Sequence, residues 1–249
     1  KRWMIRKTLE EVAPELPKTV IEDIKFDLSE KEIDLYQKLK KEILFEVERE
    51  LISKIESPMA LQHTLVKMVV LTELTCSLSL LGDDLTSTKL EVLKERLEDL
   101  LAGDDKIIVF TRFKKMAVIL EKELKHYNPV LITGDVTGQN RANNLKKFQE
   151  NDLYKILIST DAGGEGLNID RANIVFHYDL PYSYGKYVQR NGRIQRLTQK
   201  KPTIIYNLIA NKSMDVWLSK MIHNKSKISD QLFASDSLTM NDIQEMLTI

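Results

Sequence analysis

The stretch from Tyr154 to Lys200 decides the fold, and it reads YKILISTDAGGEGLNIDRANIVFHYDLPYSYGKYVQRNGRIQRLTQK. Its apolar runs at 156–158 and 174–176 are short and uninterrupted, as is typical of strands buried in a parallel sheet. Each run is followed by a polar or glycine-rich loop. Parallel strands end at the same edge of a sheet, and ligands of open α/β sheets bind outside that edge, so we expect the two loops to form one site.

The two loops carry residues suited to phosphate. Glycine lets backbone N–H groups approach a phosphate closely, and the planar fork of arginine matches phosphate oxygens. The first loop contains Gly163, Gly164 and Gly166. The second loop is followed by Arg190, Arg193 and Arg196. Their three-residue spacing predicts a helix that presents the three guanidinium groups on one face. We interpret the two loops as half of a phosphate-handling site.

The composition describes an ordinary globular protein. The chain has 249 residues, 43% hydrophobic and 30% charged, which is enough for one large domain or two small ones. Lys+Arg 37 and Asp+Glu 37 balance, so the net charge does not indicate a nucleic-acid binder. The region between Asp179 and Asp215 nevertheless contains no acidic residue, and it predicts a local basic patch.

Cysteine and histidine usage argue against a metal or a disulfide. Cys76 is the single cysteine, which excludes an intramolecular disulfide and fits a reducing compartment inside a cell. The four histidines lack the spacing of metal ligands and are interpreted as structural. No apolar run approaches the ~18 residues that a membrane span needs. The sequence begins at Lys1 without a methionine, so we expect a piece of a longer protein whose targeting signal would lie elsewhere.

The first third of the chain is expected to be mainly helical. An alternating stretch at 19–28 predicts a strand with one buried face. Ser29 followed by Glu32 forms a capping box, which predicts a helix to about residue 55. A second helical pattern covers 58–81, and its apolar stripe is interpreted as core.

The rest of the chain alternates between strand and helix. Ser87 or Thr88 is expected to cap a leucine-rich helix that ends at Gly103. Strands are predicted at 107–110, 130–133, 155–159, 173–177 and 203–208, and helices at 114–126 and 141–150. Ser213 is expected to cap a closing helix. The alternation predicts an α/β fold with a parallel sheet and helices on both faces.

Four motifs carry a resemblance to a known family. IIVFTRF (107–113), LITGDVTGQNR (131–141), ISTDAGGEGLNI (158–169) and QRNGRIQR (189–196) have the order and spacing of the C-terminal motor motifs of helicase superfamily two. The helical insertion and the leucine-rich helix narrow the resemblance to the second lobe of a Swi/Snf-type DNA translocase. The resemblance implies a RecA-like sheet of the P-loop NTPase type with an N-terminal helical insertion. The implied divisions are an inter-lobe linker with the first strand (1–28), the insertion (29–84), the RecA-like lobe (85–233) and a tail (234–249).

In that family, ATP lies between two RecA-like lobes, and the first lobe supplies the phosphate-binding loop and an acidic magnesium motif. The sequence contains neither G-x-x-x-x-G-K-[ST] nor an Asp-Glu dipeptide. The resemblance therefore implies that ATP and Mg are held mainly by an N-terminal lobe that this chain lacks. Its implied partners are that lobe and double-stranded DNA, with no membrane. The isolated chain is expected to hydrolyse ATP negligibly.

The resemblance also implies roles for individual residues. Arg193 and Arg196 match the arginine fingers. The nucleotide would be contacted or oriented by Gln189, Gly164, Glu165, Gly166 and Asn168. The DNA backbone would be contacted by Thr111, Arg112, Gly134, Arg141, Ser159, Thr160 and Gly163. Such contacts hold phosphates without reading bases.

Simpler alternatives stay open for several of these residues. Arg112 could form a surface ion pair, Arg141 could tie down its own loop, and the glycines could serve only a tight turn. Arg190 is expected to form a structural pair within the lobe, and Glu165 to pair with one of the arginines of the motif at 189–196.

Departures from the family pattern bear on the setting. The acidic residue usual in the last motif of chromatin remodellers is missing at 190–192, which favours a bacterial, phage or viral translocase in the cytoplasm, or a nuclear one if the source is eukaryotic. Two alternative functions remain: a strand-separating helicase or restriction-type translocase of the same superfamily, and a non-catalytic adaptor that binds DNA or protein.

Overall fold

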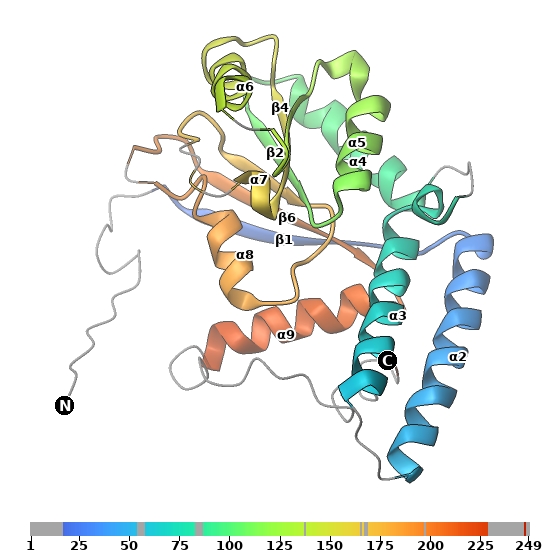
Figure 1. Ribbon diagram of the computed structural model, residues 1–249. Helices are drawn as coiled ribbons and strands as arrows, with labels where there is room; N and C mark the ends of the chain where they lie inside the picture. The colour runs from blue at the N-terminus through green and yellow to red at the C-terminus, as the bar shows by residue number, and fades with distance from the viewer. Residues whose placement is uncertain are drawn as a thin grey trace, which may run out of the picture.

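The computed structural model describes residues 17–53, 58–82, 87–136, 138–164, 166, 169–196, 198–228 and 247. Side chains at 50–53, 58–65 and 225–228 lie outside the described set. Figure 1 shows one twisted sheet with helices on both sides of it and a pair of long helices beside it. None of the helices in these ranges is long and apolar enough to cross a membrane.

The sheet has six strands among the described residues, and every neighbouring pair is parallel. Its order is β1-β6-β5-β2-β4-β3. The strands are β1 (Thr19–Phe26), β2 (Ile107–Thr111), β3 (Val130–Ile132), β4 (Ile156–Thr160), β5 (Ile174–His177) and β6 (Thr203–Ala210). The predicted α/β fold with a parallel sheet is therefore confirmed.

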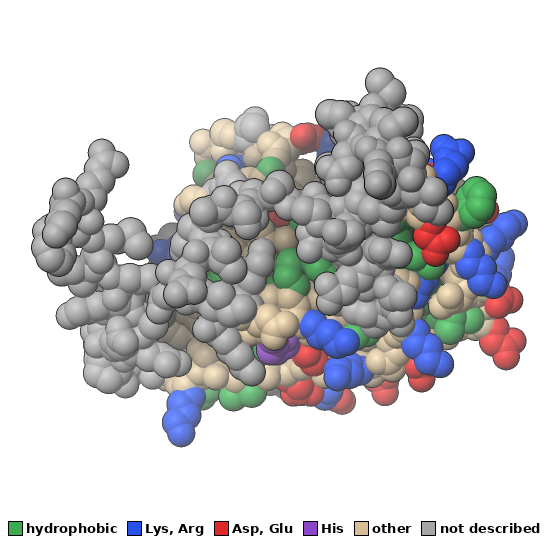
Figure 2. Space-filling model, turned by 90° about the horizontal axis from the view of Figure 1, so that it is seen from below, with side chains coloured by type: hydrophobic (Ala, Val, Ile, Leu, Met, Phe, Trp, Pro, Cys, Tyr) green, Lys and Arg blue, Asp and Glu red, His purple; other side chains and the backbone are tan. Residues whose placement is uncertain are grey.

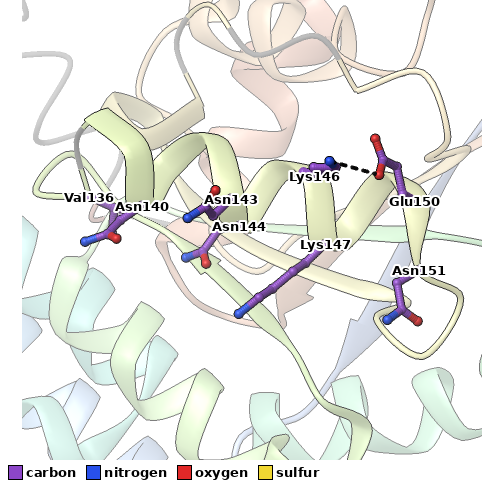
Figure 3. Close-up of a pocket in the computed structure, with 8 residues that line it drawn as sticks. All are labelled: Val136, Asn140, Asn143, Asn144, Lys146, Lys147, Glu150 and Asn151. Atoms are coloured by element: carbon purple, nitrogen blue, oxygen red, sulfur yellow. Dashed lines mark ion pairs between the residues drawn. The ribbon is translucent and has the colours of Figure 1, made fainter.

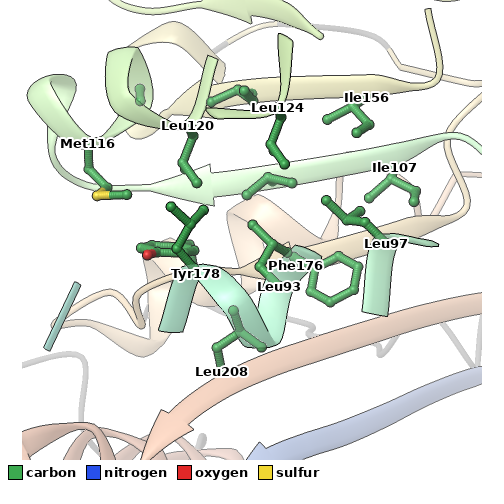
Figure 4. Packing of buried hydrophobic residues seen from close by; sticks show 14 of the residues in the cluster. Leu93, Leu97, Ile107, Met116, Leu120, Leu124, Ile156, Phe176, Tyr178 and Leu208 are labelled. Atoms are coloured by element: carbon green, nitrogen blue, oxygen red, sulfur yellow. The ribbon is translucent and has the colours of Figure 1, made fainter. Parts of the chain in front are cut away.

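Helices cover both faces of the sheet because each central strand is apolar on both faces. Ile107 and Val109 of β2 pack with α4 (Thr88–Leu101) and α5 (Lys114–Glu123). Figure 4 shows Ile107 in this cluster, with Leu97 of α4 and Leu120 of α5. Ile108 of β2 packs on the other side, with α6 (Gly138–Glu150), α8 (Tyr184–Asn191) and α9 (Met214–Ile228). Side chains that alternate along a strand point to opposite faces, which makes this two-sided burial possible.

The helical pair α2 (Glu30–Ser53) and α3 (Pro58–Cys76) packs beside the sheet on a separate apolar cluster. The predicted capping box is confirmed: Ser29 N donates to Glu32 Oε2 at 2.9 Å, and Glu32 N donates to Ser29 Oγ at 3.4 Å. The same carboxylate also accepts Thr88 N at 3.1 Å, so Glu32 caps α4 as well as α2. Ser87 is the N-cap residue of α4, as expected, but its hydroxyl donates to Cys76 O and makes no capping bond.

Three further elements connect or end the helices. A short 3₁₀ helix, η1 (Leu78–Leu81), follows α3, so the second predicted helix ends five residues early. Another, η2 (Lys125–Tyr127), follows α5. The four-residue helix α7 (Asp161–Gly164) directly follows β4. Leu247 is buried in the cluster of α2 and α3, which brings the C-terminal end of the chain back to the helical pair.

Two expectations about elements are wrong. The stretch at 19–28 is expected to form a strand with one buried face that includes Val20, but Val20 is 53% exposed because β1 is an edge strand. The helix predicted to carry three arginines ends at Asn191. The chain then tightens into turns, with Arg193 N donating to Arg190 O and Ile194 N to Asn191 O. Arg193 and Arg196 consequently lie beyond the helix and do not share one helical face with Arg190.

Candidate functional site

The glycine-rich turn packs directly on the end of a neighbouring strand. Gly163 lies in α7, and a Cβ there would sit 2.1 Å from the carbonyl oxygen of Ile132, the last residue of β3. Gly164 is almost as confined, because a Cβ would lie 3.1 Å from the Phe110 ring. Gly166 has a φ of +71°, a left-handed conformation that favours glycine. Packing alone therefore requires Gly163, whatever ligand the turn contacts.

Arg190 links this turn to α8. Its Nε donates to Asp161 Oδ1 at 2.6 Å and its Nη2 to Asp161 Oδ2 at 3.1 Å, a two-pronged ion pair. The Arg190 side chain is 2% exposed. The expectation that Arg190 forms a structural pair within the lobe is confirmed.

Asp179 joins the loop after β5 to the end of β2. Its buried carboxylate accepts the Thr111 hydroxyl at 2.5 Å, the Arg112 backbone N–H at 2.9 Å and Arg112 Nε at 3.0 Å. Its backbone carbonyl accepts Arg190 Nη1 at 2.8 Å. Asp179 thereby fixes both arginines.

Charge decides the protonation state of Asp179. Burial alone would raise the pKa of this carboxyl group. Arg112, Arg190 and the hydrogen bonds from Thr111 and the Arg112 backbone outweigh burial and lower the pKa below its ordinary value. Asp179 is therefore ionised at neutral pH, as a carboxylate between two guanidinium groups should be.

Tyr182 packs against the other side of Arg112 and links it to helix α3. Its guanidinium carbon lies 3.8 Å from the centre of the Tyr182 ring, which is stacking distance. The Tyr182 hydroxyl lies 3.1 Å from Thr72 Oγ1 on α3. The Arg112 side chain is 11% exposed, and its Nη2 is buried without a hydrogen-bond partner. A contiguous set of contacts thus runs from α3 through Tyr182 and Arg112 to Asp179.

His177 is a neutral member of the same network. Its Nε2 lies 2.8 Å from Asn191 Oδ1, and its Nδ1 lies 3.3 Å from Arg190 Nη1, which can only donate. Complete burial, followed by repulsion from Arg190, lowers the pKa of His177 to about 3. The ring therefore stays neutral at physiological pH and carries its proton on Nε2.

The three polar side chains at the strand ends expected to meet DNA bond within the protein. Ser159 Oγ donates to the carbonyl of Ile132, Thr160 Oγ1 accepts Gly163 N, and the Thr111 hydroxyl is used by Asp179. Arg141 Nη2 donates to Gly163 O at 3.0 Å, so it ties the start of α6 to the glycine turn. Gly134 and Gln189 are exposed.

The two expected arginine fingers differ in burial. Arg193 is 9% exposed, whereas Arg196 is half-buried. Arg196 forms no ion pair or side-chain hydrogen bond within the described part of the chain, and its Nε is buried without a partner. Next to it, Gln195 Nε2 donates to Thr19 Oγ1 at the first residue of β1. Glu165 and Asn168 lie outside the described residues.

Acidic residues from other stretches neutralise only part of the expected basic patch. Arg190 is neutralised by Asp161, and Lys201 Nζ lies 2.9 Å from Asp105 Oδ1, so cations of the acid-free stretch meet acids from other stretches. Figure 2 shows Lys and Arg interspersed with Asp and Glu on the described part of one face. No group of three or more potential metal ligands lies together among the described residues.

Sequence reasoning missed the carboxylates of the site. Asp161 directly follows β4 and Asp179 lies two residues after β5, positions typical of functional residues in parallel sheets. Their role required knowing that Arg190 and Arg112 come from other segments. Tyr182 and Asn191 carried no sequence signal, because a tyrosine in a loop and an asparagine in a helix are each common.

The chain matches the helicase conserved C-terminal domain over residues 88–198. It is 31% identical over 153 residues to the uncharacterized ATP-dependent helicase YqhH of Bacillus subtilis (strain 168), covering 58% of this chain and 27% of the relative. It is 25% identical over 240 residues to the uncharacterized ATP-dependent helicase MG018 of Mycoplasma genitalium, covering 94% of this chain and 23% of the relative. The chain thus spans about a quarter of the length of these two relatives.

Two solved structures have the same fold. One is the C-terminal domain of the Sulfolobus solfataricus SWI2/SNF2 ATPase, with a TM-score of 0.71 at 21% identity, covering 92% of this chain and 98% of that one. The other is the core of that ATPase in complex with double-stranded DNA, with a TM-score of 0.73 at 20% identity, covering 94% of this chain and 48% of that one. The resemblance drawn from the four motifs is confirmed in domain and fold.

Proposed function

We propose that this chain is the second motor lobe of a double-stranded-DNA-dependent ATPase that moves along DNA. The match to the helicase conserved C-terminal domain and the fold shared with a SWI2/SNF2 ATPase C-terminal domain support this proposal. The ATP and its magnesium ion would be held mainly by a first lobe. This lobe would supply guanidinium groups and contacts to the DNA backbone, and it would not hydrolyse ATP alone. The DNA-bound state of one similar structure supports the choice of partner.

The observation that carries the proposal is the unpaired guanidinium group of Arg196. Arg112 and Arg190 form ion pairs with Asp179 and Asp161, whereas Arg196 has no counter-charge within the described residues. Phosphoryl transfer spreads negative charge over the γ-phosphate oxygens, and a positioned arginine stabilises that charge. An arginine that lacks an internal acceptor suits this role, because binding phosphate would break no existing ion pair.

The position of Arg196 also supports a role between lobes. Its neighbour Gln195 bonds Thr19, where the chain enters the sheet from the segment expected to link the two lobes. Arg193 is the second proposed finger, although its near-complete burial requires the side chain to move before it can reach a nucleotide. Closure of two lobes would provide that movement and couple hydrolysis to motion.

The residues proposed to contact nucleotide and DNA differ in how exposed they are. Gln189 is exposed, and it is proposed to contact the nucleotide together with Gly164 and Gly166 of the glycine turn. Glu165 and Asn168, which lie outside the described residues, stay proposed nucleotide contacts. Gly134 and Arg141, near the end of β3 and the start of α6, are the better-placed candidates for the DNA backbone. Thr111, Arg112, Ser159, Thr160 and Gly163 remain proposed DNA contacts, and each would first have to give up or share an internal bond.

The test is ATP turnover measured with three proteins: this chain, the first lobe, and the two joined. Turnover is expected only from the joined protein, and duplex DNA should stimulate it. A joined protein that hydrolyses no ATP with duplex DNA would instead support a non-catalytic adaptor. A strand-displacement assay on the same protein separates a translocase, which leaves the duplex intact, from a strand-separating helicase.

A further inference from the structure

A hollow of about 620 Å³ runs along the outer side of α6. Its lining includes Asn140, Asn143, Asn144, Lys147 and Asn151, and Figure 3 shows their side chains on one side of the helix. Asn140, Asn143, Asn144 and Lys147 have the spacing i, i+3, i+4 and i+7, which keeps them on one face of α6, and Asn151 follows the end of the helix. At 1.5 Å per residue the four helical positions span about 10 Å.

The hollow offers more hydrogen-bond donors than acceptors. Asn143 Oδ1 already accepts Gln139 Nε2 at 3.0 Å, and Asn151 Oδ1 accepts Leu153 N at 2.9 Å, so each amide has its NH₂ group left to donate. Lys147 adds three N–H donors and makes no ion pair within the described ranges. A ligand that fits must therefore be rich in acceptors.

The local charge favours an anion. Glu150 is the one carboxylate in the lining, and it lies 3.7 Å from the Nζ of Lys146, which lines the same hollow, as the dashed line in Figure 3 marks. This pairing leaves Lys147 as the uncompensated charge. Asn144 Nδ2 donates to Leu131 O at 3.0 Å, which anchors this wall of the hollow to the edge strand β3.

A second hollow, of about 310 Å³, contains lysines whose hydrogen bonds are made within the protein, and it serves as a comparison. It lies where β2, β4 and β6 begin, and its lysines all donate to the protein itself. Lys106 donates to Asn151 O, Lys155 to Gly103 O, and Lys201 to Asp104 O. The accepting carbonyls lie just after the ends of α6 and α4, so these lysines cap helix ends and have little left for a ligand. Lys147 is committed to no such partner among the described residues.

We infer that the hollow along α6 binds a stretch of sugar–phosphate backbone of duplex DNA. Asparagine and lysine side chains are among the usual donors to phosphate and sugar oxygens, and they read no sequence. The site continues from Arg141, in the first turns of the same helix, which already reaches the glycine turn. This inference rests on the proposed function and extends the DNA contact of the lobe down the side of α6.

The test uses the two-lobe protein and a labelled duplex, with binding measured by fluorescence anisotropy over a range of salt concentrations. Asn143→Asp replaces a donor by an anionic acceptor of the same shape, and Asn143→Gln keeps the donor. Lys147→Glu reverses the unpaired charge. Lys41→Glu, at an exposed position on the distant helix α2, is the matched control for net charge. Melting temperatures verify that every variant is folded.

Asn143→Asp and Lys147→Glu are expected to weaken duplex binding, while Asn143→Gln and Lys41→Glu bind like wild type. Loss of one phosphate contact makes the slope of log affinity against log salt shallower by about 0.9. The factor by which affinity rises when salt is lowered from 200 to 50 mM is then about threefold smaller in the variant than in the wild-type protein. If Asn143→Asp and Lys147→Glu bind duplex DNA as tightly as the wild-type protein does, the inference is overturned but the proposed function is not. A wild-type protein that binds no duplex at any salt concentration overturns the proposed function as well.

Discussion

Arg190 and Asp161 face each other across the site in a two-pronged ion pair, with Nε–Oδ1 at 2.6 Å and Nη2–Oδ2 at 3.1 Å. One residue belongs to α8 and the other begins α7, so the pair fastens the glycine turn to the segment that leads to Arg193 and Arg196. Because Arg190 also donates to the Asp179 carbonyl, one guanidinium group aligns three segments. The proposed arginine fingers therefore start from a rigid base.

Coupling between Arg190 and Asp161 should be large. Arg190→Lys keeps the charge but loses the planar fork, and we expect it to lower the free energy of unfolding by about 2 kcal/mol. A double-mutant cycle with Asp161→Asn and Arg190→Lys, measured by urea unfolding, should give a coupling energy of about 1–3 kcal/mol. Effects that simply add would show that the two side chains do not stabilise each other.

Arg196→Ala should remove most turnover from the two-lobe protein. A finger is worth on the order of 10³–10⁵ in rate, so we expect kcat to fall at least about 10³-fold while the melting temperature stays near wild type, because Arg196 has no internal partner among the described residues. Arg193→Ala should lower both kcat and the melting temperature, since Arg193 is nearly buried. Full turnover of Arg196→Ala would remove it from the mechanism.

Stability should fall between pH 7 and pH 5 because of His177. Its pKa is about 3 in the folded protein and about 6.5 in the unfolded chain. The folded state therefore keeps its full stability above pH 6.5 and loses it as the unfolded histidine gains a proton, by about 2 kcal/mol at pH 5. His177→Gln should show a flatter profile over this range in urea unfolding. Parallel profiles for the two proteins would contradict the buried, neutral assignment.

Gly163→Ala should be far more destabilising than its matched control. The new methyl group would lie 2.1 Å from Ile132 O, so the turn must move and we expect a loss of about 3 kcal/mol, read as a lower melting temperature. Gly185 lies in α8, where a Cβ would meet nothing within 4 Å, so Gly185→Ala should be stabilising by about 0.5–1 kcal/mol. Equal melting temperatures for the two variants would mean that the turn is not confined.

Local patterns were enough to predict most elements of the fold. Uninterrupted apolar runs indicated the buried strands β2, β4 and β5, and the capping box of Ser29 and Glu32 indicated where α2 begins. These predictions held because strand burial and helix capping depend on neighbours within a few residues. The prediction of a helix that continues through Arg196 was wrong because the end of the helix depends on distant structure. The three-residue spacing allowed a longer helix, but the chain turns after Asn191 to reach β6.

What the sequence determined by itself is the order of strands and helices along the chain, the four motifs and the glycines and arginines within them, because these follow from short-range periodicity and residue chemistry. What only the tertiary structure decided is which charges remain available. Asp161 and Asp179 neutralise Arg190 and Arg112 across long sequence separations, while Arg196 and Lys147 are left without a described carboxylate partner. Ion pairing depends on distance in space, and the packing of the sheet and its helices sets that distance.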